Sequence, residues 1–179
     1  MAVISISTED FGIYMLQRIS DLENTSHIKL GLFEKILLAE TGTVEQILTI
    51  LTNSEVAIKI LKQKGRHQLI KREVRIFNKK TGENLVYATS NIIPCNLPDE
   101  IIRQIKQKHL SIGSIITNYQ LETFRKILKI GYNSKTRSLF RIYHIIYKEK
   151  VIFKIKEVFP LTTTHNNNNK ICHNSLKAG

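Results

Sequence analysis

Residues 69–77 read LIKREVRIF, and their alternation of apolar and charged side chains predicts a β-strand. A strand sends successive side chains to opposite faces, so the even positions of this run share one face. That face carries Ile70, Val74 and Ile76, and it also carries Arg72. A charge on an apolar face is costly unless it is paired or used, which makes Arg72 a candidate site residue.

A second strand pattern, residues 151–159 (VIFKIKEVF), repeats this feature with the opposite charge. Its odd positions are apolar except for Glu157. An inward Arg and an inward Glu on separate strands can form a pocket for a carboxylate ligand. Two other interpretations fit equally: Arg72 and Glu157 could form a buried ion pair without a ligand, or one strand could turn its polar face inward at a sheet edge.

The size of the chain favours a single domain. The sequence has 179 residues with 42% hydrophobic content, enough for one core. We expect one domain over residues 1–160 and a disordered, asparagine-rich tail over residues 161–179. No apolar run approaches the roughly 20 residues of a membrane span. The start, MAVISISTED, resembles neither a secretory signal nor an Arg-rich transit peptide.

The cysteines and histidines give no sign of a metal or disulfide framework. Cys95 and Cys172 lack CxxC spacing, and the six histidines form neither an HxxxH nor an HExxH pattern. His144 falls in a predicted strand, where a structural role is expected. These patterns predict no metal site and a reducing compartment.

The net charge of +12 can reflect either binding to an anionic partner or the amino-acid composition of the source genome. Nucleic acid, an acidic membrane and a small anionic substrate are all conceivable partners. The basic residues are spread along the chain, without a basic block interleaved with aromatics, which argues against nucleic acid. The abundance of Ile, Lys and Asn is typical of AT-rich genomes, and this composition explains most of the charge.

Hydrophobic periodicity predicts helices clustered in the first third and strands after them. Helices are expected over residues 7–24, 30–39, 44–51 and 98–109, and strands over 55–63, 69–77, 84–93, 138–147 and 151–159. Residues 119–130 fit either a helix or a strand, residues 111–113 are predicted as a break, and residues 131–136 as a turn. The sum predicts an α+β fold, a single antiparallel sheet of about six strands with helices packed on one face.

Two threonines are predicted to begin helices. Thr8 is expected to cap the first helix and Thr43 the third. Free backbone N–H groups at the start of the third helix could hold an anion, although most such starts are only caps.

Five stretches of the chain, in the same order and with similar separations, resemble the chorismate lyase family in its plastid, bacterial and archaeal branch. They are LLAETGTVEQIL, LIKREVRIF, LVYATSNIIPCNLP, LSIGSIITN and IFKIKEVFP. The resemblance covers roughly residues 30–160. It implies an antiparallel sheet flanked by helices, in agreement with the pattern of predicted elements.

The resemblance also implies an activity and a site. Chorismate lyases convert chorismate to 4-hydroxybenzoate and pyruvate without a cofactor. Arg72 would bind the ring carboxylate through two hydrogen bonds, and Glu157 would meet the ring hydroxyl or the ether oxygen, with a protonation state that remains open. Since chorismate is a dianion, the helix start at Thr43 and Val44 is the candidate for a second anion site.

The pocket rim is implied by the same resemblance. Ile112 and Gly113 match the family's apolar-Gly pair there, and Val44 stands where better-studied lyases carry Met. Ordinary core packing is an equal alternative for Ile112 and Val44.

Three functions remain open at this point. The first is a cofactor-free lyase that makes a quinone precursor, with a small-molecule substrate and an undefined oligomeric state. The second is a non-catalytic effector-binding module of the same fold, and the third is a nucleic-acid binder suggested by charge alone. The composition suggests an organelle-encoded protein of the plastid stroma, with a bacterial cytoplasm as the alternative.

Overall fold

The computed structural model describes residues 10–65 and 68–161. The elements, in chain order, are α1 (Phe11–Ser26), α2 (Leu32–Ala39), α3 (Val44–Thr52), β1 (Val56–Gly65), β2 (Ile70–Asn78), β3 (Asn84–Ile92), the 3-10 helix η1 (Pro94–Asn96), α4 (Asp99–Gln107), α5 (Ile112–Asn118), β4 (Thr123–Asn133), β5 (Ser138–Tyr147) and β6 (Lys150–Pro160). No helix in this part of the chain is long and apolar enough to cross a membrane.

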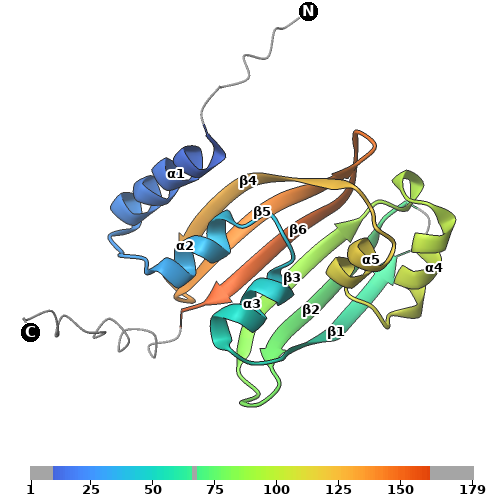
Figure 1. Cartoon of the computed structure of the whole chain (residues 1–179), viewed down its shortest axis with the longest axis horizontal. Coiled ribbons are helices and arrows are strands. Elements are labelled where there is room, and N and C mark those ends of the chain that lie inside the picture. Colours follow the sequence, from blue (N-terminus) through green and yellow to red (C-terminus); the bar gives the residue numbers. More distant parts are fainter. Residues whose placement is uncertain (1–9, 66–67, 162–179) are drawn as a thin grey trace, which may run out of the picture.

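The six strands form one antiparallel sheet in the order β1-β2-β3-β6-β5-β4. Two three-stranded meanders, β1–β3 and β4–β6, meet where β3 pairs with β6. The helices lie on one side of this sheet, with α1 and α2 near β4 and β5 and with α4 and α5 near the other end (Figure 1). The predicted fold class, one antiparallel sheet of about six strands with helices on one face, is therefore confirmed.

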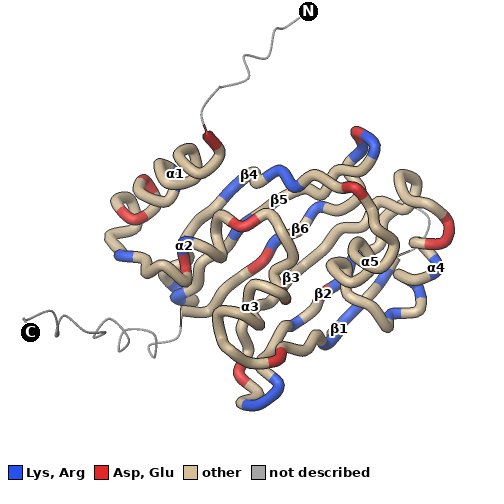
Figure 2. The backbone as a smooth tube through the Cα atoms, viewed as in Figure 1, with Lys and Arg blue, Asp and Glu red and all other residues tan. Residues whose placement is uncertain are grey.

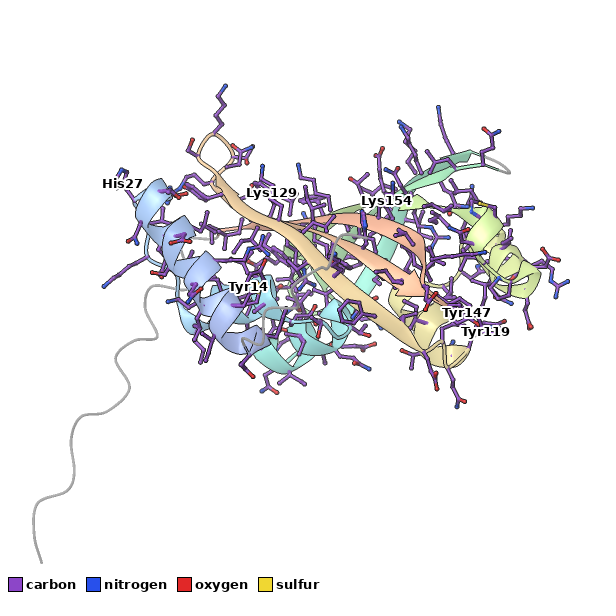
Figure 3. All side chains as sticks on the ribbon, turned by 90° about the horizontal axis from the view of Figure 1, so that it is seen from above. Tyr14, His27, Tyr119, Lys129, Tyr147 and Lys154 are labelled. Carbon is purple, nitrogen blue, oxygen red and sulfur yellow. The ribbon has the colours of Figure 1, made fainter. Side chains whose placement is uncertain are left out.

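The face of the sheet away from the helices carries lysine side chains beside apolar residues such as Phe140. In the edge view, Lys129 and Lys154 lie on this uncovered side, whereas Tyr14 of α1 lies on the helix side (Figure 3). Lys and Arg are distributed over strands, loops and helices and are not gathered in one block (Figure 2). This distribution follows the alternation of the strands, whose outward positions carry the charge.

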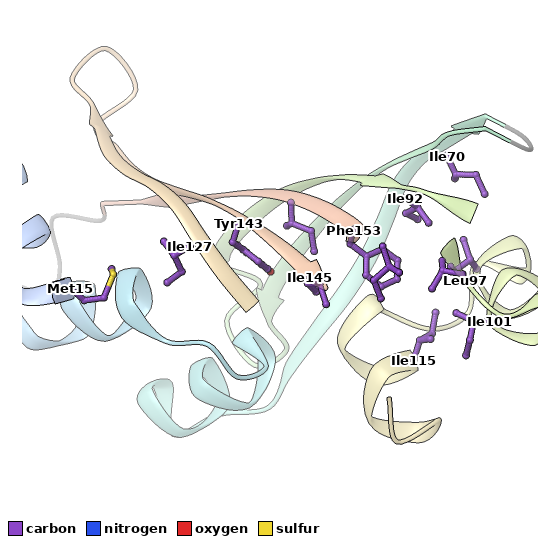
Figure 4. Close-up of a cluster of buried hydrophobic side chains, with 13 residues drawn as sticks. Met15, Ile70, Ile92, Leu97, Ile101, Ile115, Ile127, Tyr143, Ile145 and Phe153 are labelled. Carbon is purple, nitrogen blue, oxygen red and sulfur yellow. The ribbon is translucent and has the colours of Figure 1, made fainter. Parts of the chain in front are cut away.

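The helix side of the sheet holds two apolar clusters. One includes Ile155 and Tyr143 with the helices α4 and α5, and its side chains point from the sheet toward the helices (Figure 4). The other includes Leu139 and Phe159 with α2 and α3. Between the two clusters, the inward positions are charged: Arg141 on β5 and Glu157 on β6. These two residues form part of a polar site.

The start of α1 differs from the expectation. Thr8 lies outside the described residues, and α1 begins at Phe11 with Asp10 as its N-cap. The Asp10 side chain accepts hydrogen bonds from the backbone N–H groups of Gly12 (2.7 Å) and Ile13 (3.3 Å). The predicted tail beyond residue 161 also lies outside the described residues.

The predicted break at residues 111–113 is wrong. Ser111 is instead an N-cap whose hydroxyl accepts from the Ser114 N–H (2.9 Å), and α5 begins at Ile112. Gly113 lies in the first turn of this helix and does not interrupt it.

The predicted turn at residues 131–136 is also misplaced, because β4 continues to Asn133. Gly131 pairs with Phe140 of β5, and an added Cβ at Gly131 would lie 2.4 Å from the Phe140 ring. Glycine inside this strand leaves room for the Phe140 ring, which a side chain at position 131 would displace. The ambiguous residues 119–130 contribute most of β4, so the strand interpretation is correct there.

Candidate functional site

A narrow cavity lies between the helix face of the sheet and the first turns of α3 and α5. Its volume is about 50 Å³, room for a few water molecules. Its charged lining residues come from four separate elements: Glu45, Arg72, Arg125 and Glu157. Much of the remaining wall is aliphatic. A larger ligand enters only if the helices or the lining side chains move apart.

Arg72 and Glu157 face this cavity from strands that are not neighbours. Arg72 pairs with Ser90 of β3, and Glu157 of β6 pairs with Ala88 of the same strand. Adjacent strands are about 4.8 Å apart, so β3 separates the two backbones by roughly 10 Å. The exposed fractions are 1% for Arg72 and 3% for Glu157. The inward orientation that strand alternation predicts is confirmed for both side chains.

Arg72 is a buried cation that has only neutral partners among the described residues. Its Nε donates to Gln63 Oε1 (2.6 Å), Nη1 to the Leu110 carbonyl (3.0 Å) and Nη2 to the Ile105 carbonyl (2.8 Å). Burial lowers the pKa of the Arg72 guanidinium to about 10, so the group stays charged near neutral pH. Its charge is left uncompensated, which favours an anionic ligand.

Glu157 forms its ion pair with Arg141 and not with Arg72. Its Oε2 accepts from Arg141 Nε (2.6 Å), and its Oε1 accepts from the Tyr143 hydroxyl (2.9 Å). Arg141 also donates to the Glu40 carbonyl (2.7 Å) and to the Glu40 carboxylate. The interpretation of Arg72 and Glu157 as a closed ion pair is therefore wrong, because Glu157 pairs with Arg141.

Burial and neighbouring charges shift the pKa values of Arg141 and Tyr143 in this network. Burial on its own would lower the pKa of Arg141, but the charges of Glu157 and Glu40 raise it above its ordinary value. Burial and the charge of Glu157 raise the pKa of Tyr143 well above its usual range, so its phenol keeps the proton that it donates. Glu157 is thus held rigidly, with both oxygens accepting hydrogen bonds.

We expect Arg141→Met to be strongly destabilising, because it would leave Glu157 and Glu40 buried without their shared cation. Loss of one partner of a buried ion pair lowers the free energy of unfolding by about 3–5 kcal/mol. Chemical denaturation measures this change. Lys156→Met, on the exposed face of the neighbouring strand β6, is the matched control and should change stability little. Equal stability of the two variants would contradict this account of the network.

The first turns of α3 and α5 close the cavity. Val44, Ile112 and Gly113 line it, whereas Thr43 lies in an adjoining outer pocket of about 400 Å³. Thr43 is the N-cap of α3, as predicted, but its hydroxyl makes no capping hydrogen bond. An added Cβ at Gly113 would lie 2.8 Å from Thr43 Cγ2 and 3.0 Å from the Glu45 carboxylate. A side chain at position 113 would therefore require Thr43 or Glu45 to shift.

Two further charged residues of the cavity were not identified from the sequence. Glu45 lies in the first turn of α3, and burial raises the pKa of its carboxyl. Arg125 of β4 donates from Nη1 to the Thr41 carbonyl (2.6 Å), and its buried Nε makes no hydrogen bond with the described residues.

A metal site among the described residues would need a cluster of metal-binding side chains. Within residues 10–65 and 68–161, no group of three or more His, Cys, Asp or Glu side chains could hold a metal ion.

The chain is similar in sequence to a family of known proteins. The model of the family described as Chorismate pyruvate-lyase Rv2949c-like matches residues 35–166. A Methanocaldococcus jannaschii protein, named provisionally as a lyase without a substrate, is 38% identical over 143 residues, covering 70% of this chain and 77% of that protein. The chorismate pyruvate-lyase of Mycobacterium tuberculosis H37Rv is 26% identical over 162 residues, covering 73% of this chain and 81% of that enzyme.

Among solved structures, PhnF from Mycobacterium smegmatis superposes with a TM-score of 0.50 at 6% identity. The match covers 68% of this chain and 64% of that one. At this identity the likeness concerns the fold alone.

Proposed function

The chain belongs to the Chorismate pyruvate-lyase Rv2949c-like family, and from this premise we propose that it eliminates pyruvate from chorismate to give 4-hydroxybenzoate. One observation carries the proposal. A buried guanidinium without a counter-ion among the described residues and a rigidly held carboxylate face one small cavity from two strands separated by a third. Chorismate presents a ring carboxylate at one end and a hydroxyl-bearing carbon at the other, which suits this pair.

In this proposal Arg72 binds the ring carboxylate. The guanidinium is planar and offers paired donors that a single ammonium group cannot reproduce. It is held by Gln63 and by two backbone carbonyls, so its position is set before the substrate arrives. Val44 and Ile112 contact the ring, while Gly113 allows α5 to close over it.

Glu157 acts at the opposite end of the ring. Since both of its oxygens already accept hydrogen bonds, it serves as an acceptor: it orients the ring hydroxyl and takes the proton from the carbon that bears it. The C–H bond at this carbon and the C–O bond at its neighbour break, and a ring double bond forms between the two carbons. The proton ends on the released enolpyruvate, which becomes pyruvate, so the reaction balances without an oxidant or a cofactor.

Much of the rate enhancement comes from positioning. The product ring is aromatic, which provides driving force, so the protein mainly needs to hold the two ends of the ring and exclude water. The buried positions of Arg72, Glu157 and Tyr143 on one face of the sheet suit this task.

Incubation of the purified protein with chorismate tests the proposal. Chromatography of the mixture should show 4-hydroxybenzoate and pyruvate in equal amounts. Lys71→Met, next to Arg72 on the exposed face of β2, should turn over chorismate like the wild type. Absence of both products, with a thermal shift by 4-hydroxybenzoate, would instead indicate a non-catalytic module that binds aromatic acids.

The role of the product and the compartment are part of the same proposal. The 4-hydroxybenzoate would serve as a precursor for prenylquinone synthesis. The composition, rich in Ile, Lys and Asn, favours an AT-rich genome, so the protein would act in a plastid stroma if organelle-encoded and otherwise in a cytoplasm. Mapping the gene to a nuclear chromosome would contradict an organelle-encoded origin.

A further inference from the structure

The proposed reaction gives no role to two charged side chains that line the cavity, Glu45 and Arg125. Arg125 is the cation of the two. It extends from β4, at the edge of the sheet, and lines the same cavity as Arg72. Its Nε is buried and has no hydrogen-bond partner among the described residues. A buried donor without an acceptor is unfavourable, so this position calls for an acceptor such as a water, an ion or a ligand atom.

The surroundings of Arg125 place it near the reacting end of the cavity. The centre of its guanidinium lies 5.9 Å from the centroid of the Tyr143 ring. Tyr143 is the residue that donates to Glu157. Arg72 approaches the cavity from β2, with three strands between β2 and β4, so the two guanidinium groups enter from opposite flanks.

We infer that Arg125 binds the carboxylate of the enolpyruvyl group, the second carboxylate of the substrate. The inference rests on the proposed function, because that group is what a chorismate lyase removes. Arg72 and Arg125 then divide the two negative charges of the dianion between them. The charge of Glu157 is only partly compensated by Arg141, because Glu157 shares this cation with Glu40.

The start of α3, which sequence analysis offered for this second carboxylate, is less suitable. The carboxyl of Glu45 already lies in the first turn of α3, where burial raises its pKa and its own backbone N–H and Ser111 partly offset this. A ligand carboxylate at this position would displace or face a carboxylate of the chain itself. Arg125 Nε is a cationic donor that nothing in the described chain occupies.

Two probes that differ by one carboxylate test the inference. The first is 4-hydroxybenzoate. The second is 3-(carboxymethoxy)-4-hydroxybenzoate, an aromatic and therefore unreactive dianion that carries the ring acid, the hydroxyl and an ether-linked acid. Calorimetry on the full-length protein should show that Arg125→Gln weakens binding of the dianion by roughly 10- to 150-fold. Its affinity for 4-hydroxybenzoate should stay within about twofold of the wild type.

Two further variants complete the experiment. Lys126→Gln, adjacent in β4 and exposed, should leave both affinities unchanged. Arg125→Lys keeps the charge and should recover part of the lost dianion affinity, which a purely structural role would not produce. The KM for chorismate should rise in Arg125→Gln in parallel with the dianion's dissociation constant.

Equal weakening of both probes would overturn the inference, because it would mean that Arg125 only anchors the α2–α3 loop through Thr41. No weakening of either probe would overturn it as well. If the wild type binds both probes without converting chorismate, the lyase proposal fails while the comparison of probes still decides the role of Arg125. If the wild type binds neither probe, both proposals fail.

Discussion

Arg72→Met is expected to remove most chorismate turnover while leaving the protein folded. Truncation of one partner of a buried, hydrogen-bonded charge pair costs about 2–5 kcal/mol, which corresponds to roughly 30- to 4,000-fold in kcat/KM. Folding should survive because two effects oppose each other. The variant loses three hydrogen bonds to neutral groups, but it also removes a buried charge that has no counter-ion in the described chain.

The measurement combines steady-state kinetics with thermal unfolding of the same preparation. Lys71→Met is the matched control, since it makes the same chemical change one residue away on the exposed face. Arg72→Lys keeps the charge but loses the planar pair of donors, so its activity should fall between those of Arg72→Met and the wild type. A folded Arg72→Met variant with wild-type kcat/KM would show that Arg72 does not bind the substrate.

Glu157→Gln is expected to lower kcat by roughly 10²- to 10⁴-fold, because the amide cannot accept the ring proton. The side chain keeps its size, and its oxygen can still accept from Arg141. Arg141 also remains paired with Glu40, so the free energy of unfolding should fall by only about 1–3 kcal/mol. Affinity for 4-hydroxybenzoate should change much less than kcat, since the amide can still hydrogen bond to the phenol.

Rapid-quench kinetics and calorimetry on Glu157→Gln separate these two quantities. Glu73→Gln makes the same substitution on the exposed face of β2 and should behave like the wild type. An unchanged kcat in Glu157→Gln would rule out proton transfer to this carboxylate. An equal loss of kcat and product affinity would limit Glu157 to binding.

Strand alternation was enough to find Arg72 and Glu157, because both interrupt apolar faces that the structure buries. The same reasoning applied to residues 138–147 would have found Arg141, which stands between Leu139 and Tyr143 on the inward face. It could not show which of these charges pair. That depends on the strand order, which puts β6 between β3 and β5 and so brings Glu157 next to Arg141.

Arg125 and the rim of the cavity were harder to predict for local reasons. Residues 119–130 have a pattern that fits a helix or a strand, so the direction of Arg125 could not be assigned. The start of α5 at Ile112 was missed because residues 111–113 were interpreted as a break, whereas Ser111 caps the helix and Gly113 packs close to Thr43. In both places a tertiary contact overrides the local propensity.

The central claim is that the cavity between Arg72 and Glu157 eliminates pyruvate from chorismate. A single-turnover experiment tests it most directly, because the narrow cavity of about 50 Å³ is expected to release its aromatic product slowly. With enzyme in excess over chorismate, quenched samples should contain 4-hydroxybenzoate and pyruvate rising together to one equivalent each. Chorismate recovered intact from wild-type protein that binds 4-hydroxybenzoate would contradict the claim.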